Sequence, residues 1–244
     1  MNTALLEQLD RYYDAAPRGR ARTEEVGPFT LFVATSGWPY YARPSRARPR
    51  AATLDDVRRV LARQRELGVP LAIEWVQKRA PSLAEVVETA GMRVQRCPLL
   101  VLSGMPLGVA GSARIIGTDD VDILVASRAA VSVGFANGGT LVGPEGIEAR
   151  DAVASTSAQV DDTLTAQIAA GDIRVGAVFA PQTPDVGPVG GGSYTPVGEV
   201  AEIAGVAVLP AYRRRGLAAQ LAHALAADAL HRGVTTVFCS AQSD

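Results

Sequence analysis

Hydrophobic and polar residues along the 244-residue chain follow helical and strand-like spacings, and these predict the order of the elements. In the first part, helical spacing over 4–15 precedes a strand-like run over 29–33. The arginine- and proline-rich stretch 42–50 predicts a loop. A helix over 54–67 follows, with a threonine cap and an acidic first turn before it and Gly68 as its stop.

The pattern then continues with short alternating segments. We expect a strand over 71–76, a helix over 83–89 capped by Ser82, and a further strand over 94–102. Strands that alternate with helices are typical of an α/β unit. The glycine-rich stretch 104–111 reads as a boundary, so we expect one domain over 1–110 and a second over 111–244.

The second domain shows the same alternation with stronger signals. The segment 181–196 is rich in proline and glycine and predicts a loop or the tip of a long hairpin. The strongest strand is expected at 198–209 and the strongest helix at 217–231, where leucines recur every four residues. The remaining predicted elements are a strand over 113–116, a helix over 119–131, a broken helical region over 147–168 and strands over 173–180 and 234–239.

Composition narrows the class of protein further. Hydrophobic residues make up 48% and charged residues 20%, as in a globular protein, and a net charge of −1 offers no basis for binding nucleic acid or a membrane surface. Cys97 and Cys239 have no CxxC partner, which excludes a disulfide framework and fits a reducing cytoplasm. The start lacks a signal-peptide pattern and no run reaches the roughly 18–20 apolar residues of a membrane span. We expect a cytoplasmic protein without a metal.

The segment 198–218, GEVAEIAGVAVLPAYRRRGLA, carries the chemistry. A strand runs into Pro210, and three arginines with Gly216 then stand at the start of a helix. Helix N-termini have unsatisfied N–H groups and a partial positive charge, so they attract phosphate oxygens. The arrangement predicts an anion site suited to pyrophosphate, or alternatively a solvated basic helix start. It lacks the GKS or GKT of a Walker loop.

Together, the strand Val206-Ala-Val208, Pro210, Tyr212 and the pattern Arg213-x-x-Gly216-x-Ala218 resemble the acetyl-CoA motif of the GNAT superfamily of N-acetyltransferases. The resemblance implies an α/β fold with a mixed sheet, in which the strand holds the pantetheine arm and the loop amides hold the pyrophosphate. It also implies that the strand N–H near Val206 polarises the thioester carbonyl. The implied cofactor-binding residues are Val206, Ala207, Val208, Arg213, Arg214, Arg215, Gly216, Leu217 and Ala218.

The same resemblance identifies Glu202, eleven residues before Arg213, as the general base. A base is required because only a neutral amine attacks a thioester, and most amines are protonated at neutral pH. Glu199 is the second candidate, since a bulge in the strand would change which carboxylate points inward. Both are also compatible with ordinary exposed strand residues.

The resemblance covers about 113–244 and implies transfer of an acetyl group from acetyl-CoA to a primary amine on a small molecule or peptide, in a protein that can form a homodimer. It implies a last helix, further strands and the leaving-group acid beyond Asp244. The segment 213–218 is called the arginine-glycine loop below. The first domain looks like a degenerate copy of the second without such a loop, and a tandem arrangement of this kind is known among bacterial members of the family. The alternatives are a non-catalytic acyl-CoA-binding regulatory module and a nucleic-acid contact through the arginines, assisted by 43–50.

Overall fold

The computed structural model describes residues 3–35, 39–156 and 160–241. The chain divides into two compact units, Met1–Arg96 and Cys97–Asp244. This division lies before the boundary expected at 110, because Leu99–Val101 forms a strand that pairs within the sheet of the second unit. The expected strand over 94–102 is therefore shorter and belongs to the other unit.

The first unit contains a three-stranded antiparallel sheet in the order β1-β2-β3. The strand β2, FTLFVA, supplies its buried centre, and the helix α2 packs its apolar stripe against the same core. The elements of this unit are α1 (Thr3–Ala15), β1 (Ala21–Val26), β2 (Phe29–Ala34), β3 (Ala42–Pro44), α2 (Leu54–Glu66) and α3 (Leu83–Thr89).

Three features of this unit differ from the prediction. The strand β3 lies inside the predicted loop 42–50, where it pairs with β2. The strand predicted over 71–76 is reduced to a single parallel bridge between Ala42 and Ile73. The strand β1, ARTEEV, was not predicted, because its sequence shows no alternation of apolar and polar residues. It lies at the edge of the sheet, and much of its surface faces water.

The start of α2 is closed by its own side chains. The Thr53 side chain accepts a hydrogen bond from the Asp56 N–H, and the Asp56 carboxylate accepts from the Thr53 N–H, which completes a capping box. Arg50 donates to both carboxylate oxygens of Asp56 at 2.6 and 2.8 Å. These hydrogen bonds hold the pKa of Asp56 well below its ordinary value, with the Arg50 guanidinium as the main cause.

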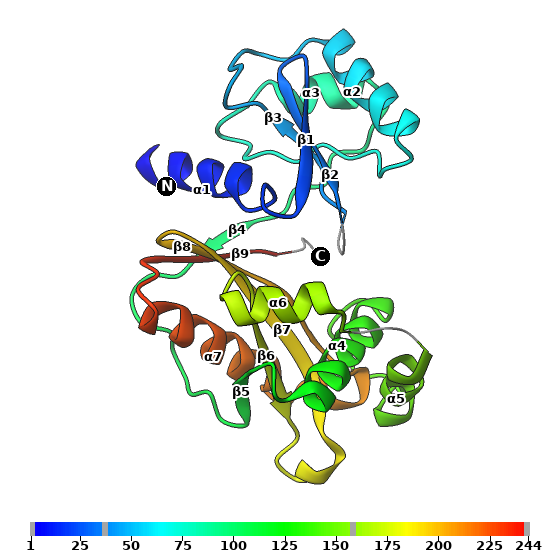
Figure 1. Cartoon of the computed structure of the whole chain (residues 1–244), viewed down its shortest axis with the longest axis vertical. Helices are drawn as coiled ribbons and strands as arrows, with labels where there is room; N and C mark the ends of the chain where they lie inside the picture. The colour runs from blue at the N-terminus through cyan, green and yellow to red at the C-terminus, as the bar shows by residue number, and fades with distance from the viewer. Residues whose placement is uncertain (1–2, 36–38, 157–159, 242–244) are drawn as a thin grey trace. The chain divides into compact units, whose positions relative to one another are not determined.

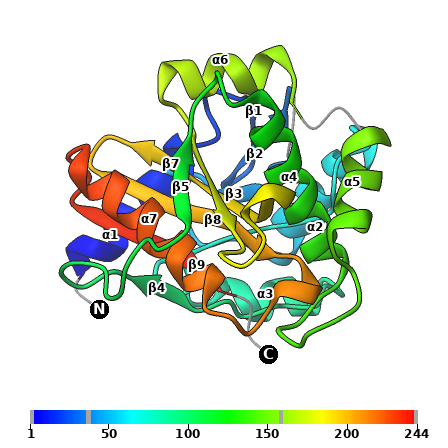
Figure 2. The ribbon, with the colours of Figure 1, turned by 90° about the horizontal axis from the view of Figure 1, so that it is seen from below.

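The second unit is built on a six-stranded mixed sheet in the order β4-β9-β8-β7-β6-β5 (Figures 1 and 2). All neighbouring strands are antiparallel except β8 and β9, which are parallel and joined by α7. The helices and strands are β4 (Leu99–Val101), β5 (Ala113–Ile116), α4 (Val121–Ala136), α5 (Ile147–Thr156), α6 (Asp162–Ala170), β6 (Arg174–Phe179), β7 (Pro188–Val197), β8 (Val200–Val208), α7 (Leu217–His231) and β9 (Thr236–Ser240), with short 3-10 turns η1 (Pro184–Val186) and η2 (Pro210–Tyr212).

Helices cover both faces of this sheet, with α7 on one face and α4 on the other (Figure 2). The Tyr194 hydroxyl of β7 donates to Asp228 of α7 at 2.6 Å, which ties the middle of the sheet to that helix. Burial and this hydrogen bond raise the pKa of Tyr194 well above its ordinary value. The hydroxyl therefore stays protonated and remains a donor.

Most of the segment 181–196, expected to be a loop or the tip of a long hairpin, belongs to the central strand β7. Three consecutive glycines explain why the segment was predicted to be irregular and why it fits at the centre of the sheet. A Cβ on Gly191 would lie 2.9 Å from the Ser127 carbonyl oxygen of α4. A Cβ on Gly192, which faces the other way, would lie 2.9 Å from a Val206 methyl and 3.4 Å from Leu225 of α7. The glycines let both helices approach the sheet closely, and only the tip of the hairpin is a turn.

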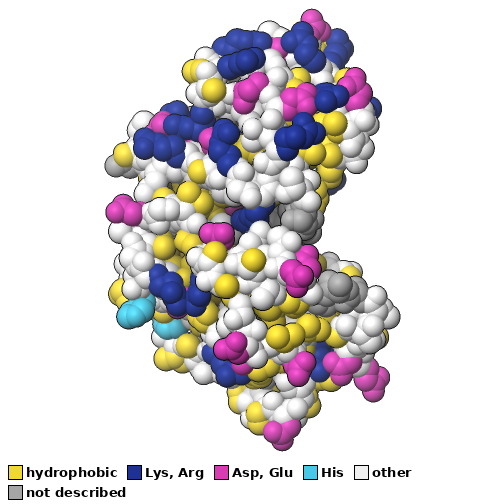
Figure 3. Space-filling view, in the orientation of Figure 1, with side chains coloured by type: hydrophobic (Ala, Val, Ile, Leu, Met, Phe, Trp, Pro, Cys, Tyr) yellow, Lys and Arg dark blue, Asp and Glu magenta, His cyan; other side chains and the backbone are white. Residues whose placement is uncertain are grey.

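The two units carry opposite net charges. Residues 1–96 contain 16 Lys and Arg against 11 Asp and Glu, whereas residues 97–244 contain 8 against 14. On the face shown in Figure 3, Lys and Arg side chains accordingly gather over the first unit. Three of the eight basic residues of the second unit stand together at Arg213–Arg215, so positive charge is concentrated at one place in an otherwise acidic unit.

Candidate functional site

The parallel strands β8 and β9 part in the middle of the sheet. They pair only from Val200 to Glu202, after which β9 continues beside β4 alone. The strand β8 runs on to Val208, and no other described strand pairs with its free edge beyond Glu202. Backbone N–H and C=O groups along such an edge need partners, so the edge can receive an extended polar ligand.

A β-bulge lies on this same stretch of β8. Gly191 pairs with Ala207 and Ser193 pairs with Ala204, so Gly205 and Val206 together oppose the single residue Gly192. An extra residue of this kind leaves the ladder locally and re-aims its backbone groups. The bulge places the backbone at Val206 beside the gap between the strands.

After β8, the chain passes through the η2 turn into the start of α7. Gly216 is the N-cap of this helix with φ +74°, and its lack of a side chain leaves the first N–H groups without a side-chain cap. A Cβ there would meet nothing within 4 Å, so glycine is required by the backbone angle rather than by crowding. Arg214 also has a positive φ of 63°, a backbone angle that costs an ordinary residue of order 1–3 kcal/mol. Strained turns of this kind recur at ligand-binding loops.

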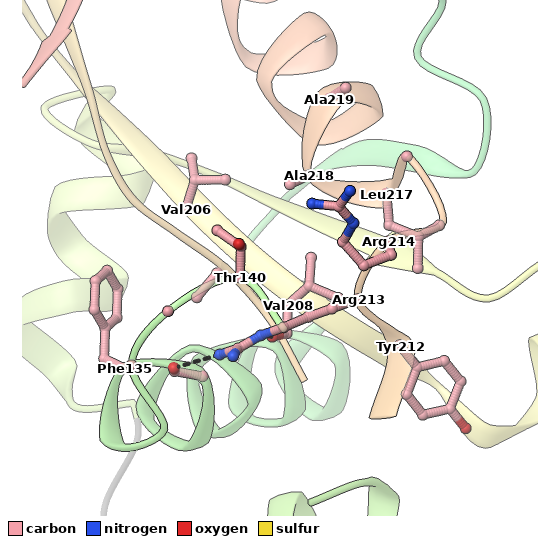
Figure 4. A pocket seen from close by; sticks show the side chains of 15 residues that line it. Phe135, Thr140, Val206, Val208, Tyr212, Arg213, Arg214, Leu217, Ala218 and Ala219 are labelled. Atoms are coloured by element: carbon pink, nitrogen blue, oxygen red, sulfur yellow. Dashed lines mark hydrogen bonds between the residues drawn. The ribbon is translucent and has the colours of Figure 1, made fainter. Parts of the chain in front are cut away.

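A cavity of about 440 Å³ joins these features (Figure 4). One wall is the bulged end of β8 with the first turn of α7, and the other is the C-terminal end of α4 with the loop after it. Its lining consists of Gly134, Phe135, Gly138, Gly139, Thr140, Val206, Ala207, Val208, Tyr212, Arg213, Arg214, Gly216, Leu217, Ala218 and Ala219.

All but one of the nine predicted cofactor-binding residues line this cavity. The exception is Arg215, which borders a separate surface depression together with Glu145 and Glu148. Its guanidinium lies 5.0 Å from the centre of the Tyr212 ring and donates to the Ala211 carbonyl. The Arg215 side chain is thus directed away from the cavity.

The side chains of Arg213 and Arg214 point in different directions (Figure 4). Arg213 donates to the carbonyl oxygens of Gly134 and Asn137 at 2.8 and 2.6 Å, at the end of α4. The Arg213 side chain is therefore directed to the end of α4 rather than to the start of α7. Arg214 is exposed, lines the cavity and forms no ion pair or hydrogen bond through its guanidinium with another described residue.

The two candidate bases occupy different places. Glu202 lies on β8 where β9 departs, paired with Thr195 of β7. Its side chain is on the sheet face covered by α4, because its partner lies on the same face as Gly191, whose missing Cβ would meet that helix. Glu199 lies outside β8, in the exposed turn after β7, where its carbonyl accepts hydrogen bonds from the Thr235 and Thr236 N–H groups.

The wall from α4 was missed by sequence reasoning. The helix was predicted to end at Val131 but continues to Ala136, which brings Phe135 and the following loop to the cavity. Asn137-Gly138-Gly139 is a helix-stop signal that would have given the correct end. That this end faces the start of α7, 76 residues away in sequence from Asn137 to Arg213, follows only from the tertiary structure.

Comparison with solved structures agrees with this fold. A GCN5-related N-acetyltransferase from Kribbella flavida superposes with a TM-score of 0.60 at 20% identity, covering 98% of this chain and 86% of that one. A functionally unknown conserved protein from Staphylococcus epidermidis superposes with a TM-score of 0.51 at 12% identity, covering 96% and 87%. No curated protein matches the sequence significantly.

The chain thus shares the mixed α/β fold of a GCN5-related N-acetyltransferase structure. Residues 155–244, which contain β8, the arginine-glycine loop and α7, match the model of the Acetyltransferase (GNAT) family. This match lies wholly within the second unit and includes every residue of the loop 213–218.

Two further observations concern the described residues. They contain no group of three or more His, Cys, Asp and Glu side chains arranged to hold a metal ion. No helix within the described ranges is long and apolar enough to cross a membrane.

Proposed function

We propose that the C-terminal unit binds acetyl-CoA along β8 and transfers its acetyl group to a primary amine. The observation that carries the proposal is the edge of β8 beyond Glu202, which no other strand in the described ranges pairs with, and which is followed through the η2 turn by the start of α7 without a side-chain cap. An extended amide-containing arm followed by a pyrophosphate has the chemistry of that surface. The arm offers donors and acceptors to the strand edge, and the pyrophosphate accepts from the helix N–H groups.

Each part of the cavity supports one part of the ligand in this proposal. The backbone amides from Arg214 to Ala218 hold the pyrophosphate, and the exposed Arg214 guanidinium adds a positive charge beside them, whereas the Arg213 amide donates to the Pro210 carbonyl. Val206, Ala207 and Val208 flank the pantetheine arm. The N–H at the bulge near Val206 is aimed at the thioester carbonyl, where negative charge develops as the amine attacks.

The reaction proposed is direct attack. The amine nitrogen forms a bond to the thioester carbonyl carbon, the C–S bond breaks, and coenzyme A leaves as its thiol after protonation. Glu202 accepts the proton that the amine loses, because it stands on β8 beside the parting of the strands and on the face covered by α4. Glu199 is less favoured, since it belongs to the turn at the far end of β8.

The first unit fits the role of a degenerate GNAT-like domain. Its order β3, α2 and the parallel bridge at Ile73 repeats, in a shorter form, the order β8, α7 and β9. The fold similarity to the Kribbella flavida structure extends over 98% of the chain, so both units contribute to it. We propose a domain boundary at the division between Arg96 and Cys97 in place of 110.

Titration calorimetry with acetyl-CoA tests the ligand. The parent protein is expected to bind with micromolar affinity, and a variant with Arg214→Met and Gly216→Glu is expected to lose that affinity. Arg114→Met removes an exposed arginine from the edge strand β5 and serves as the control for loss of positive charge. A folded parent that does not bind acetyl-CoA would refute the proposal.

Release of free thiol in the presence of an amine panel then tests the reaction. The acceptor is expected to be a primary amine on a small molecule or peptide, and thiol release should depend on its concentration. Acetyl-CoA binding with no thiol release for any amine would instead favour a regulatory module that senses acyl-CoA.

A further inference from the structure

The Arg213 side chain is held by hydrogen bonds within the protein. Its guanidinium donates to four backbone carbonyl oxygens: Gly134 at 2.8 Å, Asn137 at 2.6 Å, Leu141 at 3.3 Å and Val208 at 3.3 Å. These carbonyls belong to three elements: the C-terminal end of α4, the loop after it, and the end of β8. The side chain is half-buried between them.

Carbonyl groups at the C-terminal end of a helix are favourable partners for an arginine side chain. The last carbonyls of α4 have no intrahelical donor, and the helix dipole adds partial negative charge there. Arg213 donates charge-assisted hydrogen bonds to the Gly134 carbonyl and to that of the C-cap residue Asn137, while the Asn137 side chain donates to the Val133 carbonyl. The end of α4 therefore depends on a residue of the arginine-glycine loop.

The residues held in this way form the second wall of the cavity. Phe135 and Thr140 line it, and they lie on either side of Asn137 in the chain. Farther along, the loop is attached to the η2 turn by two backbone hydrogen bonds, from Gly143 to Pro210 and from Ala211 to Glu145. Arg213 thus provides the attachment at the cavity end, and backbone bonds provide the other.

We propose that Arg213 is a positioning residue whose side chain couples the acetyl-CoA-binding loop to the C-terminal end of α4. Its backbone amide donates to the Pro210 carbonyl, while its side chain fixes the second wall of the cavity. The space left for an acceptor beside the pantetheine arm therefore depends on this side chain. The catalytic part of this inference rests on the proposed function. The structural part does not, because the four hydrogen bonds exist without a ligand.

Hydrogen exchange of the ligand-free full chain tests the coupling directly. Arg213→Met keeps the backbone amide and the length of the side chain but removes every donor, so exchange in 134–142 is expected to accelerate by about tenfold or more, given the strength of hydrogen bonds to charged groups. Arg213→Lys, which cannot reach all the carbonyls, should give an intermediate acceleration. Arg214→Met is the matched control and should leave exchange in 134–142 unchanged, since its side chain does not contact that wall.

Measuring acetyl-CoA affinity distinguishes this positioning role of Arg213 from direct recognition of phosphate by its side chain. The Arg213→Met protein should keep its acetyl-CoA affinity within about threefold, while the KM for an accepted amine rises by tenfold or more. Exchange in β6 and β7 should match that of the parent, which shows that the fold is intact. Unchanged exchange in 134–142 would overturn the proposal, as would a loss of acetyl-CoA affinity larger than that of Arg214→Met. Failure of the parent to bind acetyl-CoA would remove the proposed function but leave the exchange result standing.

Discussion

The starts of the helices α2 and α7 show how two similar strand–helix arrangements acquire different abilities. Both follow a strand and both lead toward a parallel pairing, yet α2 is closed by Thr53 and Asp56, and α7 is left open by Gly216. The carboxylate of Asp56 occupies the place at the α2 N-terminus where a bound anion would lie, and Arg50 neutralises it. At α7 the corresponding N–H groups and the nearby Arg214 remain available.

The difference teaches that a helix N-terminus becomes an anion site only when the chain does not fill it. The side chain of Asp56 is 4% exposed, so no external phosphate can compete for its position. The first unit is also the more basic of the two, which shows that net charge alone does not create the site. Local arrangement of a few polar groups decides it.

The largest effect is expected at Glu202, the base proposed for the second unit. Glu202→Gln should reduce kcat at neutral pH by about 10² or more, because a general base contributes that much to proton transfer, and it should flatten the acid limb of the rate profile. Acetyl-CoA affinity should stay nearly unchanged. Steady-state kinetics with an accepted amine provide the measurement, and Glu199→Gln is the matched control. Full activity of Glu202→Gln would mean that another group accepts the proton.

A single substitution can give α7 the closure that α2 already has. Ala219 stands at the third helical position of α7, as Asp56 does in α2, and it is exposed in the cavity. Ala219→Asp should weaken acetyl-CoA binding by about a hundredfold, since juxtaposed like charges cost several kcal/mol. Thermal stability should not fall, because an acidic side chain is favourable in the first turn. Calorimetry against the neutral Ala219→Asn variant isolates the charge.

Opening α2 should lower stability rather than create a second site. Asp56→Asn removes the charge that Arg50 pairs with, at an expected cost of about 2–3 kcal/mol in the free energy of unfolding. Both tryptophans, Trp38 and Trp75, belong to the first unit, so tryptophan fluorescence during denaturation reports its unfolding. Asp55→Asn, at a neighbouring side chain that is 82% exposed, is the control and should change little.

The ion pair between Asp56 and Arg50 also predicts how the stability of the first unit depends on pH. The pKa of Asp56 is lower in the folded state than in the unfolded chain, so its contribution is complete above the unfolded value of about 4 and is lost as the pH falls below it. The Asp56→Asn protein should therefore lose less stability than the parent between neutral pH and strongly acidic pH. Equal acid sensitivity in both proteins would show that other carboxylates dominate.

The smallest effect is expected at the N-cap of α7. Gly216→Ala places a Cβ in open space but on a backbone with φ +74°, so we expect a loss of about 1 kcal/mol in stability and a modest fall in acetyl-CoA affinity. Gly138→Ala, in the same cavity without a positive φ, should be nearly neutral. A Gly216→Ala protein as stable as the parent would show that this backbone angle relaxes easily.

Strong local signals made much of the C-terminal unit predictable. The leucine spacing over 217–231 gave the bounds of α7 correctly, and the strand β5 matched its prediction as well. The strand-to-helix turn was also predictable, because a strand, a proline stop, a glycine and arginines follow one another within a few residues. Local propensity and the tertiary structure agree there, so the sequence was sufficient.

Tertiary packing decided the parts that the sequence alone assigned wrongly. Glycines read as loop residues, yet 190–192 form the centre of the sheet because α4 and α7 press against both faces. The arginines read as one cluster, yet Arg213 turns to the end of α4, Arg214 faces the cavity and Arg215 lies on Tyr212.

The sequence by itself therefore determined that a basic, glycine-capped helix start follows a strand, because both are set by residues adjacent in the chain. Only the tertiary structure decided what the second wall of the cavity is and which arginine supports it. Those contacts join residues more than 70 positions apart, and their partners are backbone carbonyls, which every residue type presents alike.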